Sequence, residues 1–153
     1  MKILLDEGTT EFIIEGKGDD GYRFAIHNRY INYDYTTYYF CYGDIELITD
    51  QFRKFLNSEI KEVKSVSTVE PALCFILCPK GAKAIRRTGE EIVYYTIINQ
   101  QEKVKEDYYT SNFMVIEFDF CINGCYGVQH WSVELTEKES IDFCKQWIAE
   151  MQE

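Results

Sequence analysis

The chain has 153 residues, which is the usual size of one domain and enough to bury a hydrophobic core. Apolar residues make up 46% and aromatic residues 16%, a composition that excludes an intrinsically disordered chain. The 26 acidic residues outnumber the 16 basic ones, and the net charge of −10 repels phosphate backbones and anionic membrane surfaces. We therefore expect a single domain over residues 1–153, without direct binding to nucleic acid or membrane.

The charge is unevenly distributed along the chain. Residues 1–60 carry 6 basic and 11 acidic side chains, for a net of −5, and residues 61–90 carry 6 and 3, for a net of +3. Residues 91–153 carry 4 and 12, for a net of −8. We expect faces of opposite sign, and an acidic face speeds encounter with a basic partner. The same acidity also serves solubility.

The sequence predicts a cytoplasmic location. The apolar run Met1–Leu5 meets Asp6 at once, so it is too short for a signal peptide. The longest apolar stretch, Ala72–Cys78, is far shorter than a membrane span. In a reducing compartment the six cysteines are expected to be thiols rather than disulfides.

Alternation and turn residues predict a chain rich in strands. Asp20-Gly21 marks a hairpin turn, and Thr49 is expected to cap a helix whose first residue is Asp50. Thr136 and Glu139 form a capping box for a last helix, with Ile141, Cys144, Ile148 and Met151 as its apolar stripe. The residues 100–112 are polar and are expected to form a loop. The expected strands are Lys2–Leu5, Glu11–Glu15, Tyr22–His27, Tyr30–Tyr42, Ser65–Val69, Ala72–Cys78, Ala82–Arg87, Glu91–Asn99, Phe113–Ile122 and Val128–Leu135; the expected first helix is Asp50–Ile60.

These elements predict an α+β fold. It is a mostly antiparallel meandering sheet with one inserted helix and one C-terminal helix. Ala72–Cys78 is apolar on both faces and is therefore placed centrally in the sheet.

The spacing of the cysteines suggests a zinc site as one alternative function. Two pairs, each separated by three residues, have a spacing typical of tetrahedral zinc ligands. Against this, Cys74 lies inside an apolar strand, where a thiol behaves as a small hydrophobe. No metal or other cofactor is therefore predicted, and the alternative rests on Cys74, Cys78, Cys121 and Cys125.

Catalytic motifs are the next alternative. A cysteine–histidine nucleophile needs a histidine beside a thiolate, and the only histidines, His27 and His130, lie in expected strands beside aromatic residues. Ser132 follows His130-Trp131, but it has no nucleophile-elbow sequence around it. Paired carboxylates are plentiful, and most flank expected turns. No catalytic residue is predicted.

Tyrosines beside acidic residues form the most suggestive pattern. Interfaces favour tyrosine as an anchor, and carboxylates accelerate capture of a basic partner. The competing interpretation is that tyrosine-rich strands simply pack a sheet. The predicted partner-binding residues are Tyr33, Asp34, Tyr35, Tyr38, Glu102, Glu106, Asp107, Tyr108 and Tyr109.

Several stretches resemble bacterial immunity proteins, the cytosolic antidotes of contact-dependent growth-inhibition toxins and wall-associated toxins. They are Tyr42-Gly43-Asp44-Ile45 running into the helix Asp50–Asn57, Val69-Glu70-Pro71 before the strand Leu73–Leu77, and His130-Trp131-Ser132-Val133-Glu134-Leu135-Thr136 leading into Ile141–Met151. The resemblance implies a small α+β protein that binds and blocks a cognate toxin domain, often a nuclease. It implies no catalytic residues.

The sequence thus predicts an inhibitor that covers a basic toxin site with an acidic, tyrosine-bearing surface. A small-molecule-binding domain or enzyme with a tyrosine-lined pocket is the alternative, and its mark would be several Cys, His or carboxylate groups converging in one cavity.

Overall fold

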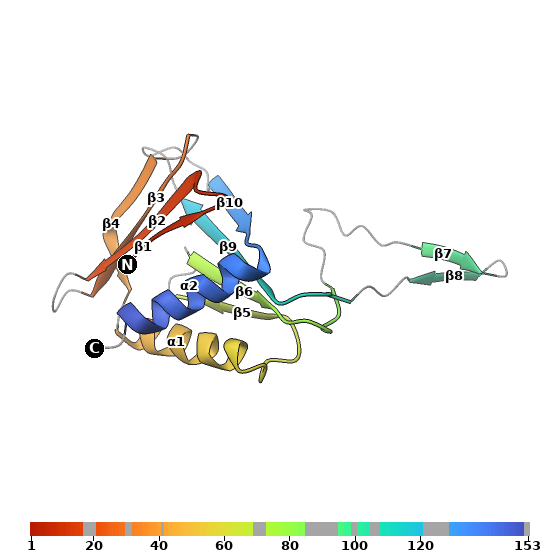
Figure 1. Cartoon of the computed structure of the whole chain (residues 1–153). Coiled ribbons are helices and arrows are strands. Elements are labelled where there is room, and N and C mark those ends of the chain that lie inside the picture. The colour runs from red at the N-terminus through yellow and green to blue at the C-terminus, as the bar shows by residue number, and fades with distance from the viewer. Residues whose placement is uncertain are drawn as a thin grey trace.

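Two four-stranded antiparallel sheets and two helices make up the body of the protein (Figure 1). The first sheet has the order β1-β2-β3-β4, so each strand pairs with the next along the chain. The computed structural model describes residues 1–16, 21–29, 32–40, 42–68, 73–84, 95–98, 101–104, 108–120 and 129–151. The strands of the first sheet are β1 (Lys2–Leu5), β2 (Thr10–Gly16), β3 (Tyr22–His27) and β4 (Asn32–Phe40).

The second sheet brings together strands that are distant in the sequence. Its order is β10-β9-β6-β5, so β6 is central, as its apolar faces predict. All neighbours are antiparallel, and a further hairpin is formed by β7 and β8. These strands are β5 (Lys64–Ser67), β6 (Leu73–Cys78), β7 (Tyr95–Ile98), β8 (Gln101–Val104), β9 (Phe113–Phe120) and β10 (Gln129–Glu134).

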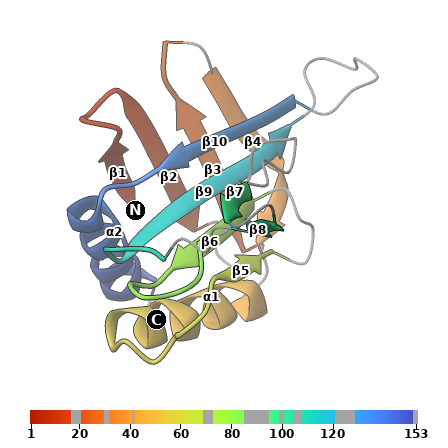
Figure 2. The same ribbon diagram turned by 90° about the vertical axis from the view of Figure 1, so that its right-hand side faces the viewer.

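The α+β class, the antiparallel pairing and the presence of one inserted and one C-terminal helix confirm the sequence prediction. The strands divide between two main sheets and a hairpin, a division that the spacing of the strands does not specify. Helix α1 (Tyr42–Leu56) follows β4, and α2 (Glu137–Glu150) follows β10. The two helices pack against each other beside the sheets, as Figure 2 shows from the side.

A cluster of aromatic rings joins both sheets to both helices. Phe52 of α1 lies at its centre, with ring centroids 5.2 Å from Phe75 of β6 and 5.4 Å from Trp147 of α2. The two sheets meet where Phe24 of β3 contacts Phe118 of β9 edge to face, at 5.8 Å. All five side chains are fully or almost fully buried. Edge-to-face rings add to the stabilisation that burial of apolar area gives.

The first helix begins eight residues earlier than predicted. Tyr42 was expected to end a strand, but it begins the helix, which already includes Asp44, whose carboxylate favours the helix N-terminus. Thr49 is therefore not a cap. Its buried hydroxyl accepts a hydrogen bond of 2.9 Å from Trp147 Nε1.

The same helix ends before Ile60, where the prediction had placed its end. Ser58 adopts a left-handed conformation with φ of 58°. Its N–H donates to the Phe55 carbonyl at 3.1 Å, and the Glu59 N–H donates to the Lys54 carbonyl at 2.9 Å. This pair of bonds is the Schellman motif, which stops a helix, usually with a glycine where Ser58 stands.

Helix α2 confirms the predicted capping box and the burial of Cys144 and Met151 in the predicted stripe, but the other two stripe positions are only half-buried. Phe143 and Trp147 are fully buried beside Cys144, whereas Ile141 and Ile148 are half-buried. The larger aromatic side chains occupy the core because they bury more apolar area. Neither described helix is long and apolar enough to cross a membrane.

The polar stretch 100–112 contains a strand, so the loop prediction is wrong there. Gln101–Val104 is β8, and it pairs with β7 from Tyr95↔Val104 to Ile98↔Gln101. Cross-strand pairing overrides the low strand propensity of its glutamine, glutamate and lysine. Of the predicted strand Ala82–Arg87 the structure describes residues 82–84, with one isolated bridge at Lys83.

Candidate protein-binding surface

The β6–β9 ladder continues beyond the body of the second sheet. Its last regular pair is Cys78↔Phe113, and an isolated antiparallel bridge joins Lys83 to Tyr108. Lys83 lies five residues after Cys78, and Tyr108 lies five residues before Phe113, so the bridge keeps the register of the ladder. We call residues 79–84, 95–98, 101–104 and 108–112 the arm. Figure 1 shows it extending from the second sheet and carrying β7 and β8.

Backbone hydrogen bonds fix the root of the arm. The Gly81 N–H donates to the Tyr109 carbonyl at 2.8 Å, and the Tyr109 N–H donates to the Ala82 carbonyl at 3.0 Å. The Lys80 N–H donates to Asn112 Oδ1 at 2.8 Å. Gly81 has φ of +83°, a conformation that a side chain would strain. These bonds hold the two chain segments at a fixed spacing.

Tyr108 and Tyr109 differ in solvent exposure at this root. The Tyr109 ring packs edge to face on Phe113, with centroids 4.8 Å apart, and is half-buried. Tyr108 is 57% exposed, which makes it one of three large apolar side chains that the described part of the chain leaves in solvent. The other two are Leu4 of β1 and Leu47 of α1. A hydrogen-bonded backbone segment thus presents an exposed tyrosine.

The predicted residues on β4 belong to the other sheet. Tyr33 is the register partner of Ile26 and Asp34 is the partner of Ala25. Because positions alternate along a strand, Tyr33 and Tyr35 fall on the face of the sheet that carries the buried Ile26, and Asp34 falls on the opposite face. β4 is one of the two edge strands of this sheet, and Tyr38 lies further along β4.

The nine predicted contact residues therefore do not lie on one element. Four belong to β4, and Glu102, Tyr108 and Tyr109 belong to the arm, which Figure 1 shows on the other side of the body. Glu106 and Asp107 lie outside the described residues. The prediction that all of them contact one partner stays a prediction.

The cysteines and histidines were the alternative site. Cys74 and Cys78 lie in β6, and burial raises the pKa of the Cys144 thiol to about 12. Cys121 and Cys125 lie outside the described residues. His27 Nδ1 is 3.7 Å from Glu11 Oε1. His130 lies in strand β10. Within the described ranges, no three metal-binding side chains converge.

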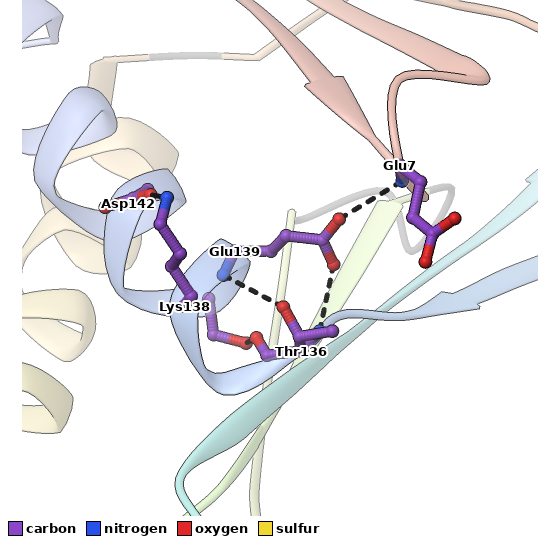
Figure 3. A network of polar contacts seen from close by, with 6 residues as sticks. Glu7, Thr136, Lys138, Glu139 and Asp142 are labelled. Atoms are coloured by element: carbon purple, nitrogen blue, oxygen red, sulfur yellow. Dashed lines mark hydrogen bonds and ion pairs between the residues drawn. The ribbon is translucent and has the colours of Figure 1, made fainter.

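A second polar network lies where α2 begins, and it has a structural role (Figure 3). The Thr136 hydroxyl accepts a 3.2 Å hydrogen bond from the Glu139 N–H, and Glu139 Oε2 accepts one of 2.9 Å from the Thr136 N–H. Glu139 Oε1 also accepts from the Glu7 N–H at 3.3 Å. The capping box therefore reaches across to the turn between β1 and β2.

Glu139 is held as a carboxylate by this network. Burial alone would raise its pKa, but hydrogen bonds from the backbone N–H groups of Thr136, Glu7 and Asp6 outweigh it, and the pKa of Glu139 is lowered. The turn needs this support, because Asp6 and Glu7 have φ of 53° and 55°, a region that residues with a side chain rarely adopt. Gly8 continues it with φ of 85°.

Comparison with protein-family models, with curated proteins and with solved structures finds no match to this chain. The family resemblance drawn from the sequence therefore rests on the sequence stretches that suggested it.

Sequence reasoning missed two features of the arm. It did not extend the β6–β9 pairing to Lys83 and Tyr108, because a five-residue gap in a ladder has no sequence signal. It also missed the pairing of β7 with β8. Asn99-Gln100, which separates these strands in the sequence, lacks the glycine that usually marks a two-residue hairpin, so no turn signal pointed to the pairing.

Proposed function

We propose that this chain is an immunity protein, which binds and neutralises a cognate bacterial toxin domain. The resemblance of its sequence stretches to such proteins supports the class, and the charge of −10 supports a basic partner. We further propose that the arm supplies part of the contact surface.

The observation that carries this proposal is the 57% exposure of Tyr108 on a hydrogen-bonded root. Tyrosine offers a large amphipathic contact area and loses little conformational freedom when it binds, because it has few rotatable bonds. The root also fixes the backbone before binding, which lowers the ordering cost of association.

The test is binding to the products of the genes adjacent to this one, among which the proposal expects a toxin domain, measured by calorimetry, together with rescue of growth when both are expressed. We expect tight binding that weakens as salt rises, and Tyr108→Ala should weaken it by roughly tenfold or more. Leu47→Ala is the matched control, because Leu47 is 50% exposed on α1 and lies outside the arm. It should bind as the wild type does.

Absence of binding and of growth rescue by the wild-type chain would overturn the proposed function. Equal weakening by Tyr108→Ala and Leu47→Ala would leave the function standing but remove the arm from it.

A further inference from the structure

Two chain segments with exposed lysines meet at the end of the second sheet where the arm begins. Lys64 of β5 is the register partner of Leu77 of β6, so β5 begins where β6 ends. The loop before β5 and the root of the arm therefore lie at the same end of the sheet, as Figure 1 shows. We call the four exposed lysines of residues 57–64 and 79–84 the basic end; they are Lys61, Lys64, Lys80 and Lys83.

The contacts of the basic end differ from those of lysines elsewhere in the chain. Lys61 Nζ donates a 2.6 Å hydrogen bond to the Ser58 carbonyl rather than to a carboxylate. Lys64 and Lys80 make no ion pair with another residue that the structure describes. Three other lysines each lie within 2.7 Å of a carboxylate: Lys2, Lys54 and Lys138. The basic end therefore keeps ammonium groups that a partner can reach.

The described residues at this end carry a net positive charge, opposite in sign to the charge of the whole chain. Residues 57–64, 79–84 and 108–112 hold four lysines and two glutamates, so their net charge is 4 − 2 = +2. One of the two glutamates, Glu59, accepts a 3.3 Å hydrogen bond from Asn57 Nδ2. The local sign agrees with the net of +3 that residues 61–90 carry in the sequence. A partner that faces this end meets a basic surface.

Tyr108 lies beside the basic end. It is the bridge partner of Lys83, and directly opposite residues of an antiparallel pair share a face. Tyr108 is 57% exposed, and Lys83 is exposed too. A phenol hydroxyl and an ammonium group both donate hydrogen bonds, and a bond from an ammonium group to a carboxylate is among the stronger ones. This pair of side chains suits a carboxylate.

We propose that the basic end, together with Tyr108, docks on a carboxylate-bearing patch of the toxin domain. This inference rests on the proposed function and refines it, because it makes the toxin surface opposite the root of the arm acidic even if the toxin as a whole is basic. The lysines pair with the carboxylates at the rim of the contact, and Tyr108 supplies area to bury. Charges of both signs, each opposed by its complement, also fix the orientation of the complex.

Two other occupants fit this surface less well. A nucleic acid presents phosphates of one sign, and Glu59 and Glu62 lie in the same loop as Lys61, where they oppose such a backbone. A second copy of the chain also offers carboxylates, but Tyr108 makes the basic end continuous with the surface already proposed for the toxin. Both occupants are outcomes of the experiment.

Charge reversal at two segments tests the basic end. The ligand is the toxin domain recovered among the products of the adjacent genes. Lys64→Glu and Lys80→Glu, which lie on different segments, should each raise the Kd for it by ~10-fold and slow association. Lys80→Arg keeps the charge and should bind within ~2-fold of the wild type. Thermal melts of all variants should coincide with that of the wild type, because both lysines are exposed.

Lys145→Glu is the matched control. Lys145 is exposed on α2 and makes no ion pair with a described residue, and its reversal gives the chain the same net charge as the two test variants. If the sign at the basic end decides, Lys145→Glu should leave the Kd within ~2-fold of the wild type or lower it. Association rates are measured by stopped-flow mixing at two salt concentrations.

The outcomes separate this inference from the function on which it rests. If the wild-type chain binds the toxin domain but Lys64→Glu and Lys80→Glu bind it as Lys145→Glu does, the inference is wrong and the function stands. If the wild-type chain binds no adjacent gene product, both are wrong. A gel shift of DNA or RNA, or a dimer of this chain in sedimentation, that is lost in Lys80→Glu would assign the basic end to that occupant and overturn the inference.

Discussion

The junction at the start of α2 and the arm use polar and aromatic groups in opposite ways. At the junction Glu139 accepts hydrogen bonds from Thr136 and Glu7, and each group is satisfied inside the chain. On the arm Tyr108 stays exposed although the backbone around it is held by hydrogen bonds. Folding alone explains the first arrangement. The second places a mostly exposed tyrosine on an ordered backbone, an arrangement that favours binding.

This contrast predicts that substitutions in the body change stability and that substitutions in the arm change binding. Four substitutions, taken from the largest expected change in stability to the smallest, test whether the two properties separate.

The core gives the largest expected change. Phe52→Ala removes a fully buried ring that contacts Phe75, Phe143 and Trp147, so it leaves a cavity where both helices meet the second sheet. We expect the free energy of unfolding in urea to fall by about 3–5 kcal/mol. The affinity of the fraction that remains folded for the proposed toxin partner should be unchanged. A loss below about 1 kcal/mol would mean that this cluster does not hold the body together.

The junction gives an intermediate change. Thr136→Ala removes the capping hydroxyl and should lower the free energy of unfolding by about 1 kcal/mol. Thr110→Ala, at an exposed position of the arm, is the matched control and should change it by less than about 0.5 kcal/mol. Equal effects would show that the junction is no more important to the fold than the arm.

The pH dependence of stability sharpens the same point. The folded-state pKa of Glu139 is lowered below its ordinary value of 4.5, so its contribution is present above that value and is lost as pH falls through the folded pKa. Glu139→Gln should therefore lower stability at neutral pH and flatten its decline in acid. Urea unfolding at several pH values between about 7 and 3 checks this, and an unchanged slope would contradict it.

The arm gives the smallest change in stability. Tyr108→Ala should alter the free energy of unfolding by less than about 0.5 kcal/mol, because the side chain is mostly in solvent. A loss above about 1 kcal/mol would make Tyr108 a structural residue and would remove the contrast between the two regions.

The sequence predicted well what depends on local patterns. Alternation located most strands, the apolar β6 was placed centrally, and Thr136 with Glu139 gave the capping box. It failed where tertiary contacts override the local signal. Thr49 resembles a helix cap in the sequence, yet it lies inside α1. There its hydroxyl accepts a hydrogen bond from Trp147, which is 98 residues away in the sequence. The division into two sheets depends on such long-range contacts too.

The candidate site was predicted only in part. The tyrosine-and-acid pattern singled out Glu102, Tyr108 and Tyr109 of the arm, but it equally singled out β4, because sequence does not tell on which sheet a strand lies. The faces of the β7–β8 hairpin could not be assigned, since they depend on which residues pair.

Hydrogen–deuterium exchange of the chain, with and without the proposed toxin partner, tests the separation of the two regions most directly. We predict that binding slows backbone exchange in peptides covering 95–104 and 108–113 and leaves 136–140 and the strand β4 unchanged. Protection confined to β4, with the arm exchanging as in the unbound chain, would contradict the account and assign binding to the tyrosines of the first sheet.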